Sequence, residues 1–229
     1  MKILSLDTST EYMSLGLKID EDFYSINIKA GQTHSEIILP EIKKLLSEHQ
    51  LTTKDLDAIA FGRGPGSFTG IRIACGIAYG LGYGASIPVI GVNNLLALAD
   101  SSGKNKVISS IDARMGEIYL SAYIKDSKTF SKPIAEGVYK PHSLPQLIES
   151  GWTLIGNAIE TYENEMKDHF GQQIDDLIDG PYEVVESISK RAKPFIKNKV
   201  LELINAEPVY LRNKVAFTTE ERKVFNAIQ

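Results

Sequence analysis

The acidic and hydroxyl residues after the first apolar segment have the types that a metal–nucleotide site uses. Asp7 follows Lys2–Leu6, a segment typical of a buried strand, and Thr8, Ser9 and Thr10 come next. A carboxylate at a strand end can hold Mg²⁺ through bound water, while hydroxyls and backbone N–H groups bind phosphate. The alternative is structural, because Asp and Thr side chains also accept hydrogen bonds from turn N–H groups. The loop sequence alone leaves both interpretations open.

A second candidate phosphate site is the glycine-rich stretch Phe61–Gly82, which has seven glycines in 22 residues. It contains no lysine, so it lacks the residue that a P-loop uses to reach phosphate. Its first glycines follow G-x-G-x-x-x-G, one residue longer than the dinucleotide-binding fingerprint. Free N–H groups at a helix start near Gly64–Ser67 can still bind an anion. The default interpretation is that Ser67 or Thr69 caps that helix.

The glycines of the predicted helix Ile71–Tyr83 indicate a contact surface. Each glycine inside a helix costs about 1 kcal/mol relative to alanine. Gly76, Gly80 and Gly84 recur every four residues, so they share one face where another backbone can approach closely. The positions between them are apolar or aromatic nearly all round. This favours either a central core helix or a helix with one face on the sheet and the other on a partner helix.

The remaining reactive side chains form no catalytic or metal-binding pattern. No two of the histidines have the i, i+3 or i+4 spacing of a helical metal site. The histidines are His34, His49, His142 and His169. No G-x-S-x-G nucleophile elbow occurs, and the single cysteine, Cys75, is expected to be a small buried side chain.

Two sets of predicted strands and helices position these residues. In the first hundred residues, three antiparallel strands precede alternating helices and strands, which predicts a mixed sheet covered by helices. The expected strands are Lys2–Leu6, Met13–Ile19, Phe23–Ile28, Leu56–Phe61 and Ile87–Val92, and the expected helices are His34–His49, Ile71–Tyr83 and Asn93–Asp100.

A second set follows the polar break Ser101–Lys106. Its expected strands are Val107–Asp112, Glu117–Ile124 and Thr153–Ile155, and its helices lie within Pro141–Ser150, Glu160–Phe170 and Ser187–Ile204. The polar end Phe217–Gln229 is expected to be frayed. We therefore divide the chain into an N-terminal lobe, residues 1–104, and a smaller C-terminal lobe and tail, residues 105–229.

Length and charge narrow the function classes. The 229 residues fit one large domain or two small lobes. A net charge of −4 and a pI of about 5.6 exclude a strongly basic nucleic-acid footprint over the whole chain, though not a local patch or binding through a partner. No apolar run is long enough for a membrane span or a secretory signal, so we expect a cytoplasmic protein.

Four motifs, in the same order, resemble the TsaB family, also called YeaZ. They are KILSLDTST, FGRGPGSFTGIRI, IDARMGEIY and PVYLRNKVA, spread from Lys2 to Ala216. The resemblance implies an α/β, two-lobe, actin-like ATPase fold, shared with sugar kinases and chaperone ATPases, with a reduced second lobe. It also implies a non-catalytic scaffold or activator in the formation of threonylcarbamoyladenosine on tRNA next to the anticodon.

The resemblance further implies the partners. Members of this family pair with the related TsaD subunit, the threonylcarbamoyl transferase, and an ATPase, TsaE, joins them. Alone they form homodimers through the same surface, on the first two helices of the N-terminal lobe, and tRNA is expected to bind through the complex. On this chain the expected interface residues are Leu39, Ile42, Ile73, Gly76, Ile77, Tyr79, Gly80 and Tyr83.

Differences from the transferase imply no metal and little or no nucleotide binding. The transferase carries Val-Asn-His-x-x-x-His, whose histidines bind a metal, and Asn94 and Leu98 occupy those positions here. The candidate nucleotide-gripping segment Leu154–Asn157 keeps one glycine of a pair. We therefore expect no cofactor, and we interpret Asp7–Thr10 as the remnant of a phosphate loop.

The alternative function is an enzyme in its own right, an ATP-dependent phosphotransferase of the actin-like fold. The loop Asp7–Thr10 and the glycine-rich stretch support it, and sugar kinases do not use the histidine pair. It requires a catalytic carboxylate facing the cleft between the lobes, for which Asp112 is the candidate. Arg114 offers this carboxylate an ion pair across the turn, which favours a structural role.

Overall fold

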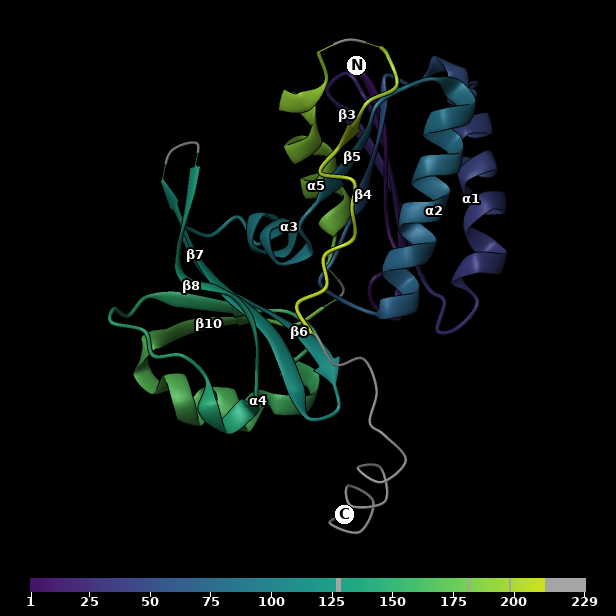
Figure 1. The fold of residues 1–229 in the computed structure, drawn as a ribbon. Helices are drawn as coiled ribbons and strands as arrows, with labels where there is room; N and C mark the ends of the chain where they lie inside the picture. Colours follow the sequence, from purple (N-terminus) through teal and green to yellow (C-terminus); the bar gives the residue numbers. More distant parts are fainter. Residues whose placement is uncertain (127–128, 181, 198, 213–229) are drawn as a thin grey trace.

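Two mixed sheets, each with helices packed against it, make up the chain (Figure 1). The computed structural model describes residues 1–126, 129–180, 182–197 and 199–212. The predicted frayed end, Phe217–Gln229, lies outside the described residues.

The first sheet has the order β11-β5-β4-β1-β2-β3. Its strands are β1 (Lys2–Asp7), β2 (Tyr12–Ile19), β3 (Asp22–Lys29), β4 (Ala58–Gly62), β5 (Val89–Val92) and β11 (Leu203–Ile204). The first three strands pair antiparallel, whereas β4, β5 and β11 continue from β1 in parallel. The central strands are apolar and buried along their length, as strands covered on both faces require. The mixed sheet predicted from the sequence is confirmed.

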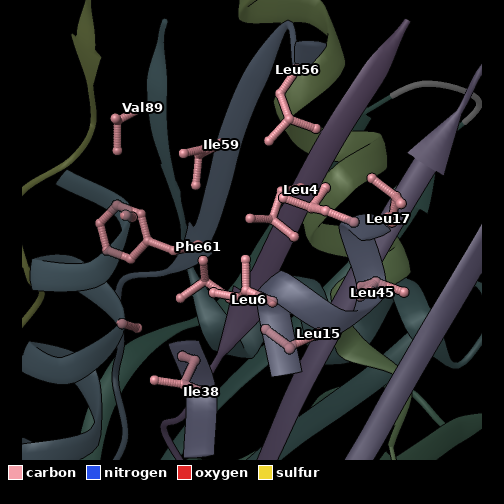
Figure 2. Close-up of a cluster of buried hydrophobic side chains, with 14 of the residues drawn as sticks. Leu4, Leu6, Leu15, Leu17, Ile38, Leu45, Leu56, Ile59, Phe61 and Val89 are labelled. Atoms are coloured by element: carbon pink, nitrogen blue, oxygen red, sulfur yellow. The ribbon is translucent and has the colours of Figure 1, made fainter. Parts of the chain in front are cut away.

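Helices cover both faces of the first sheet. On one face, α1 (His34–Glu48) and α2 (Phe68–Ala85) lie side by side (Figure 1). Their apolar side chains close a core over the strands (Figure 2). This core includes Leu4, Leu6, Leu15, Leu17, Ile38, Leu45, Leu56, Ile59, Phe61 and Val89. On the other face, α5 (Val184–Ala192) packs on residues of alternate position, such as Ile3 and Ala60.

The second sheet has the order β10-β9-β6-β7-β8. Its strands are β6 (Lys106–Arg114), β7 (Glu117–Asp126), β8 (Thr129–Tyr139), β9 (Trp152–Ile155) and β10 (Ile174–Ile178), and α4 (Ile159–Phe170) covers one face. Strands β8 and β10 were not among the predicted elements. The helix expected within residues 141–150 is a single 3₁₀ turn, Pro141–Ser143, because prolines interrupt it.

After β10 the chain returns to the first sheet. The helix expected over residues 187–204 is wrong in extent, since α5 ends at Ala192 and Pro194 lies in the 3₁₀ turn that follows it. Strand β11 then pairs with β5. The sheets change between β5 and β6, near residue 104, while α5 and β11 pack on the first sheet, so the division into residues 1–104 and 105–229 stays a prediction.

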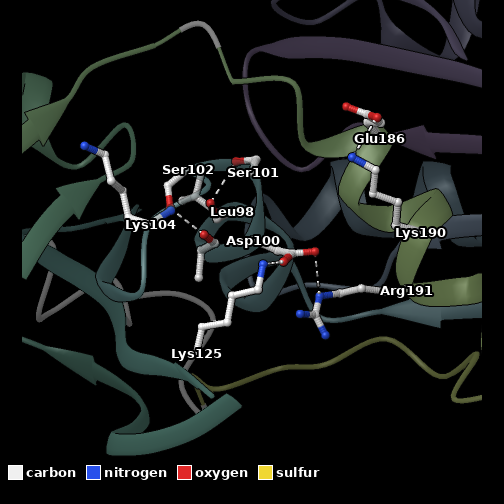
Figure 3. Close-up of polar contacts among 10 residues, drawn as sticks. Leu98, Asp100, Ser101, Ser102, Lys104, Lys125, Glu186, Lys190 and Arg191 are labelled. Carbon is white, nitrogen blue, oxygen red and sulfur yellow. Dashed lines mark hydrogen bonds and ion pairs between the residues drawn. The ribbon is translucent and has the colours of Figure 1, made fainter. Parts of the chain in front are cut away.

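An ion cluster joins the two sheets at α3 (Asn94–Ser101). Lys125 of β7 donates to Asp100 of α3 at 3.2 Å, and Arg191 Nε of α5 lies 3.4 Å from the other carboxylate oxygen (Figure 3). One carboxylate thus contacts cations from both parts of the chain.

None of the helices in the described part of the chain is both long and apolar enough to cross a membrane.

Candidate functional site

The loop after β1 is closed by a buried polar network centred on Asn94. Asp7 is 3% exposed, and its Oδ1 accepts a hydrogen bond from Asn94 Nδ2 at 2.9 Å. Asp7 Oδ2 accepts from Ser9 Oγ at 2.9 Å. The side-chain oxygen of Asn94, Oδ1, in turn accepts a hydrogen bond from the Gly64 N–H at 2.8 Å. Both carboxylate oxygens of Asp7 are therefore engaged by neutral donors of the chain itself.

The electrostatics of this network differ from those of a metal site. Burial raises the pKa of Asp7, and the hydrogen bonds from Ser9 and Asn94 oppose that rise. A metal ion at Asp7 would have to displace the hydrogen bonds that its two carboxylate oxygens accept from Ser9 and Asn94. Within the described residues, no three His, Cys, Asp or Glu side chains gather closely enough to hold a metal ion.

The helix α2 begins directly on this loop. Thr8 Oγ1 donates to the Gly70 carbonyl at 2.7 Å, and the Ser67 N–H donates to the Ser9 carbonyl at 2.7 Å. Ser67 Oγ accepts from the Gly70 N–H at 3.3 Å, so the interpretation of Ser67 as the helix cap is confirmed. The Thr8 hydroxyl thus hydrogen-bonds the first turn of α2 rather than facing an open site.

A cleft of about 510 Å³ lies between the two parts of the chain. Its first wall includes Thr10, Glu11, Ser67 and Thr69, and its second wall includes Asp112, Arg114 and Asn157. Asp112 pairs with Arg114 at 2.9 Å, as the sequence predicts, and also accepts from the Arg114 N–H at 2.7 Å. The candidate carboxylate of the alternative phosphotransferase is therefore held in a local turn.

The single glycine of the segment Leu154–Asn157 has a packing role. Gly156 adopts φ +127°, and a Cβ there would lie 1.8 Å from the Ser110 carbonyl oxygen. The neighbouring Asn157 side chain accepts from the Asp112 N–H at 3.0 Å. Gly156 packs closely on β6 and Asn157 hydrogen-bonds to it, so both residues hold β6 against the segment that follows β9.

One face of α2 is open to solvent. Positions 74, 78 and 82 of this helix are buried, whereas Gly76, Gly80 and Gly84 are exposed and have no atom within 4 Å of an added Cβ. Tyr83 is 76% exposed. The alternative of a central core helix, buried all round, is therefore wrong.

The predicted interface residues occupy three different environments. Leu39 of α1 is 47% exposed, and Gly76, Gly80 and Tyr83 of α2 are exposed with it. Ile73, Ile77 and Tyr79 are half-buried against the core. Ile42 is 2% exposed and lies inside that core, so it supports α1 rather than presenting a surface.

The sequence reasoning missed the segment Leu203–Arg212, hereafter the strap. It leaves the first sheet, follows α2 and reaches the second sheet (Figure 1). The Tyr79 hydroxyl donates to the Ala206 carbonyl at 2.8 Å, and the Val209 N–H donates to the Arg63 carbonyl at 2.7 Å. Arg212 ends the strap with an ion pair to Glu117 of β7. The motif PVYLRNKVA, which begins in the strap, was the available signal.

Comparison with known proteins identifies the family. A family model for TsaD, tRNA N6-adenosine threonylcarbamoyltransferase, matches residues 28–174. The chain is 34% identical to the tRNA threonylcarbamoyladenosine biosynthesis protein TsaB of Escherichia coli, covering 95% of this chain and 97% of that protein. Haemophilus influenzae TsaB is 32% identical, with 95% and 96% covered. The chain belongs to the TsaB family.

Two solved structures share its architecture. YeaZ from Pseudomonas aeruginosa superposes with a TM-score of 0.76 and 31% identity, covering 92% of this chain and 99% of that one. A second structure from the same organism, an uncharacterized protein with similarity to peptidase YEAZ, superposes with a TM-score of 0.77 and 30% identity. It covers the same fractions of the two chains, 92% and 99%. The two-lobe actin-like fold expected from the motifs is thereby confirmed.

Proposed function

We propose that this chain is a non-catalytic subunit that dimerises with and activates a TsaD-like threonylcarbamoyl transferase, for forming threonylcarbamoyladenosine on tRNA next to the anticodon. Membership of the TsaB family supports the pathway. The observation that carries the subunit role is the open face of α2, with Gly76, Gly80 and Gly84 in line.

Among the described residues, no contact requires glycine at these positions of the face. Each lowers helix stability by about 1 kcal/mol relative to alanine, and an added Cβ at any of them would meet nothing within 4 Å. A stripe without side chains lets a second helix backbone approach closely. The exposed side chains of Leu39 and Tyr83 supply apolar area on the two neighbouring helices.

The surroundings of Asp7 and Asp112 support a role without catalysis. Asp7 is sealed by Asn94 and Ser9, and Asp112 is paired with Arg114. Both carboxylates already have partners within the chain, which supports a role other than holding a metal or accepting a proton from a substrate. Tight ATP binding by the isolated chain in calorimetric titration would contradict this and favour the phosphotransferase.

The remaining partners follow from the same proposal. A TsaE-like ATPase joins the pair, tRNA binds through the complex, and the chain forms a homodimer through the same face when alone. The proposed location is the cytoplasm.

The test is threonylcarbamoyl transfer onto tRNA in a reconstituted mixture. The complete mixture should form product, whereas this chain alone, or the mixture without it, should form none. Product in the mixture without this chain would make it dispensable and overturn the proposal.

A further inference from the structure

The strap brings a tyrosine from the end of the described chain onto the first turns of α2. The rings of Tyr210 and Phe68 lie with centroids 5.5 Å apart at a tilt of 43°. Tyr210 is 138 residues away from Arg72, yet its hydroxyl accepts a hydrogen bond from Arg72 Nε at 3.0 Å. This contact is the part of the strap that the proposed function leaves unexplained.

Arg72 is held flat by these two aromatic rings. Its guanidinium carbon lies 3.6 Å from the centroid of the Phe68 ring and 5.6 Å from that of Tyr210. Stacking and the Nε–H bond fix the plane of the group. Among the described residues, the terminal Nη groups of Arg72 have no hydrogen-bond or ion-pair partner, so the fork that binds carboxylates is presented to solvent.

The position of this cation is unusual for a helix. Arg72 is the only charged residue in Phe68–Ala85, and it lies near the N-terminal end, where the helix dipole disfavours positive charge. It precedes Gly76 by four residues, so it continues the line of Gly76, Gly80 and Gly84. A fixed, exposed arginine at the end of an apolar face has the properties of an interface anchor.

We propose that Arg72, held by Phe68 and Tyr210, binds an aspartate or glutamate side chain of the transferase subunit and sets the register of docking on α2. This rests on the proposed function, because it assumes that the transferase docks on this face. The planar fork matches a carboxylate in two parallel hydrogen bonds.

Helix α2 carries no acidic residue, so a second copy of this chain packed through α2 alone would offer Arg72 no carboxylate. A second copy that also packed through α1 could offer Glu36 or Glu48, and the self-association outcome below tests that case. The close approach that the glycines allow also calls for a protein backbone rather than a nucleic acid.

The experiment titrates the purified transferase subunit with variants of the full chain at low and moderate salt. Arg72→Gln should weaken pairing roughly 30-fold or more, and Arg72→Glu further, because the partner carboxylate loses its cation. Arg72→Lys should lose roughly 10-fold, because an ammonium lacks the planar fork. The native pairing should weaken more steeply with salt than that of Arg72→Gln.

Two control variants separate the effect of how the Arg72 side chain is held from the effect of its charge. Tyr210→Ala keeps the cation but removes its clamp, and it should weaken pairing while thermal unfolding stays close to that of the native chain. Lys140→Glu places the same charge reversal as Arg72→Glu at an exposed position after β8, and it should pair normally.

The outcomes separate this inference from the proposed docking itself. If Gly80→Leu abolishes pairing while Arg72→Gln pairs with native affinity and salt dependence, α2 docks the transferase but Arg72 is no anchor. If Arg72→Gln weakens only self-association, or only binding of tRNA to the isolated chain, the carboxylate assignment is wrong. If Gly80→Leu pairs normally, the docking face of the proposed function fails.

Discussion

The inward and outward faces of α2 use glycine for opposite reasons. On the inward face, a Cβ at Gly70 would lie 1.8 Å from the Thr8 carbonyl oxygen, and one at Gly82 would lie 2.2 Å from Val89 Cγ2. On the outward face, a Cβ at Gly76 or Gly80 would meet nothing within 4 Å. The described part of the chain requires glycine at the first pair of positions and makes no contact that requires it at the second pair.

The difference between the two faces of α2 indicates which face contacts a partner in the proposed function. A helix that only had to fold would keep glycine where backbone or side chains press on it and carry alanine elsewhere. The outward glycines therefore support a contact outside the described residues, which is the docking face proposed above. The same substitution, glycine to alanine, should change stability in opposite directions on the two faces.

The largest effect is expected at Gly70. Gly70→Ala should destabilise the isolated chain by at least about 3 kcal/mol, because the added methyl meets a backbone carbonyl that cannot turn away. Urea unfolding measures this difference. A free energy of unfolding within about 0.5 kcal/mol of that of the native chain would show that the backbone at Thr8 can move to accommodate the methyl group.

A smaller loss is expected at Gly82, where the obstacle is a side chain. Gly82→Ala should cost about 1–2 kcal/mol, since Val89 can shift only partly in the core. Combining it with Val89→Ala makes room for the added methyl group. The loss of unfolding free energy in the double variant should therefore be about 1 kcal/mol smaller than the sum of the two single losses. Strict additivity in unfolding experiments would contradict the contact.

The smallest effect is a gain on the outward face. Gly80→Ala should stabilise the isolated chain by up to about 1 kcal/mol, because alanine favours the helix and the methyl points to solvent. Gly76→Ala is the matched second site. Thermal or urea unfolding of the chain alone decides the sign, and a clear loss at both sites would mean that the outward face packs on something within the chain.

The sequence predicted the first sheet better than the second. Apolar strands such as Ile87–Val92 and the four-residue spacing of Gly76, Gly80 and Gly84 are local patterns, and both survive in the structure. Strand β8 was missed because Pro133 and exposed residues break its alternation, and β10 because Asp175 and Asp176 lie within it. Edge strands of this kind depend on pairing rather than on pattern.

The candidate site depended on contacts that no local pattern carries. The loop Asp7–Thr10 allowed two interpretations, and the observation that favours the structural one is a hydrogen bond from Asn94, which lies 87 residues from Asp7. The clamp on Arg72 joins residues 138 apart. The motif containing Tyr210 and the helix Ile71–Tyr83 were both visible in the sequence, but the contact between them was not.

The most direct test of the outward face is the affinity of the Gly80→Leu chain for the purified transferase subunit. The free energy of unfolding of this variant should lie within about 1 kcal/mol of that of the native chain. Its affinity for the transferase subunit should fall by at least about 100-fold, because the leucine blocks the close approach of the partner backbone. Native affinity in a folded Gly80→Leu chain would contradict it and move the docking surface away from α2.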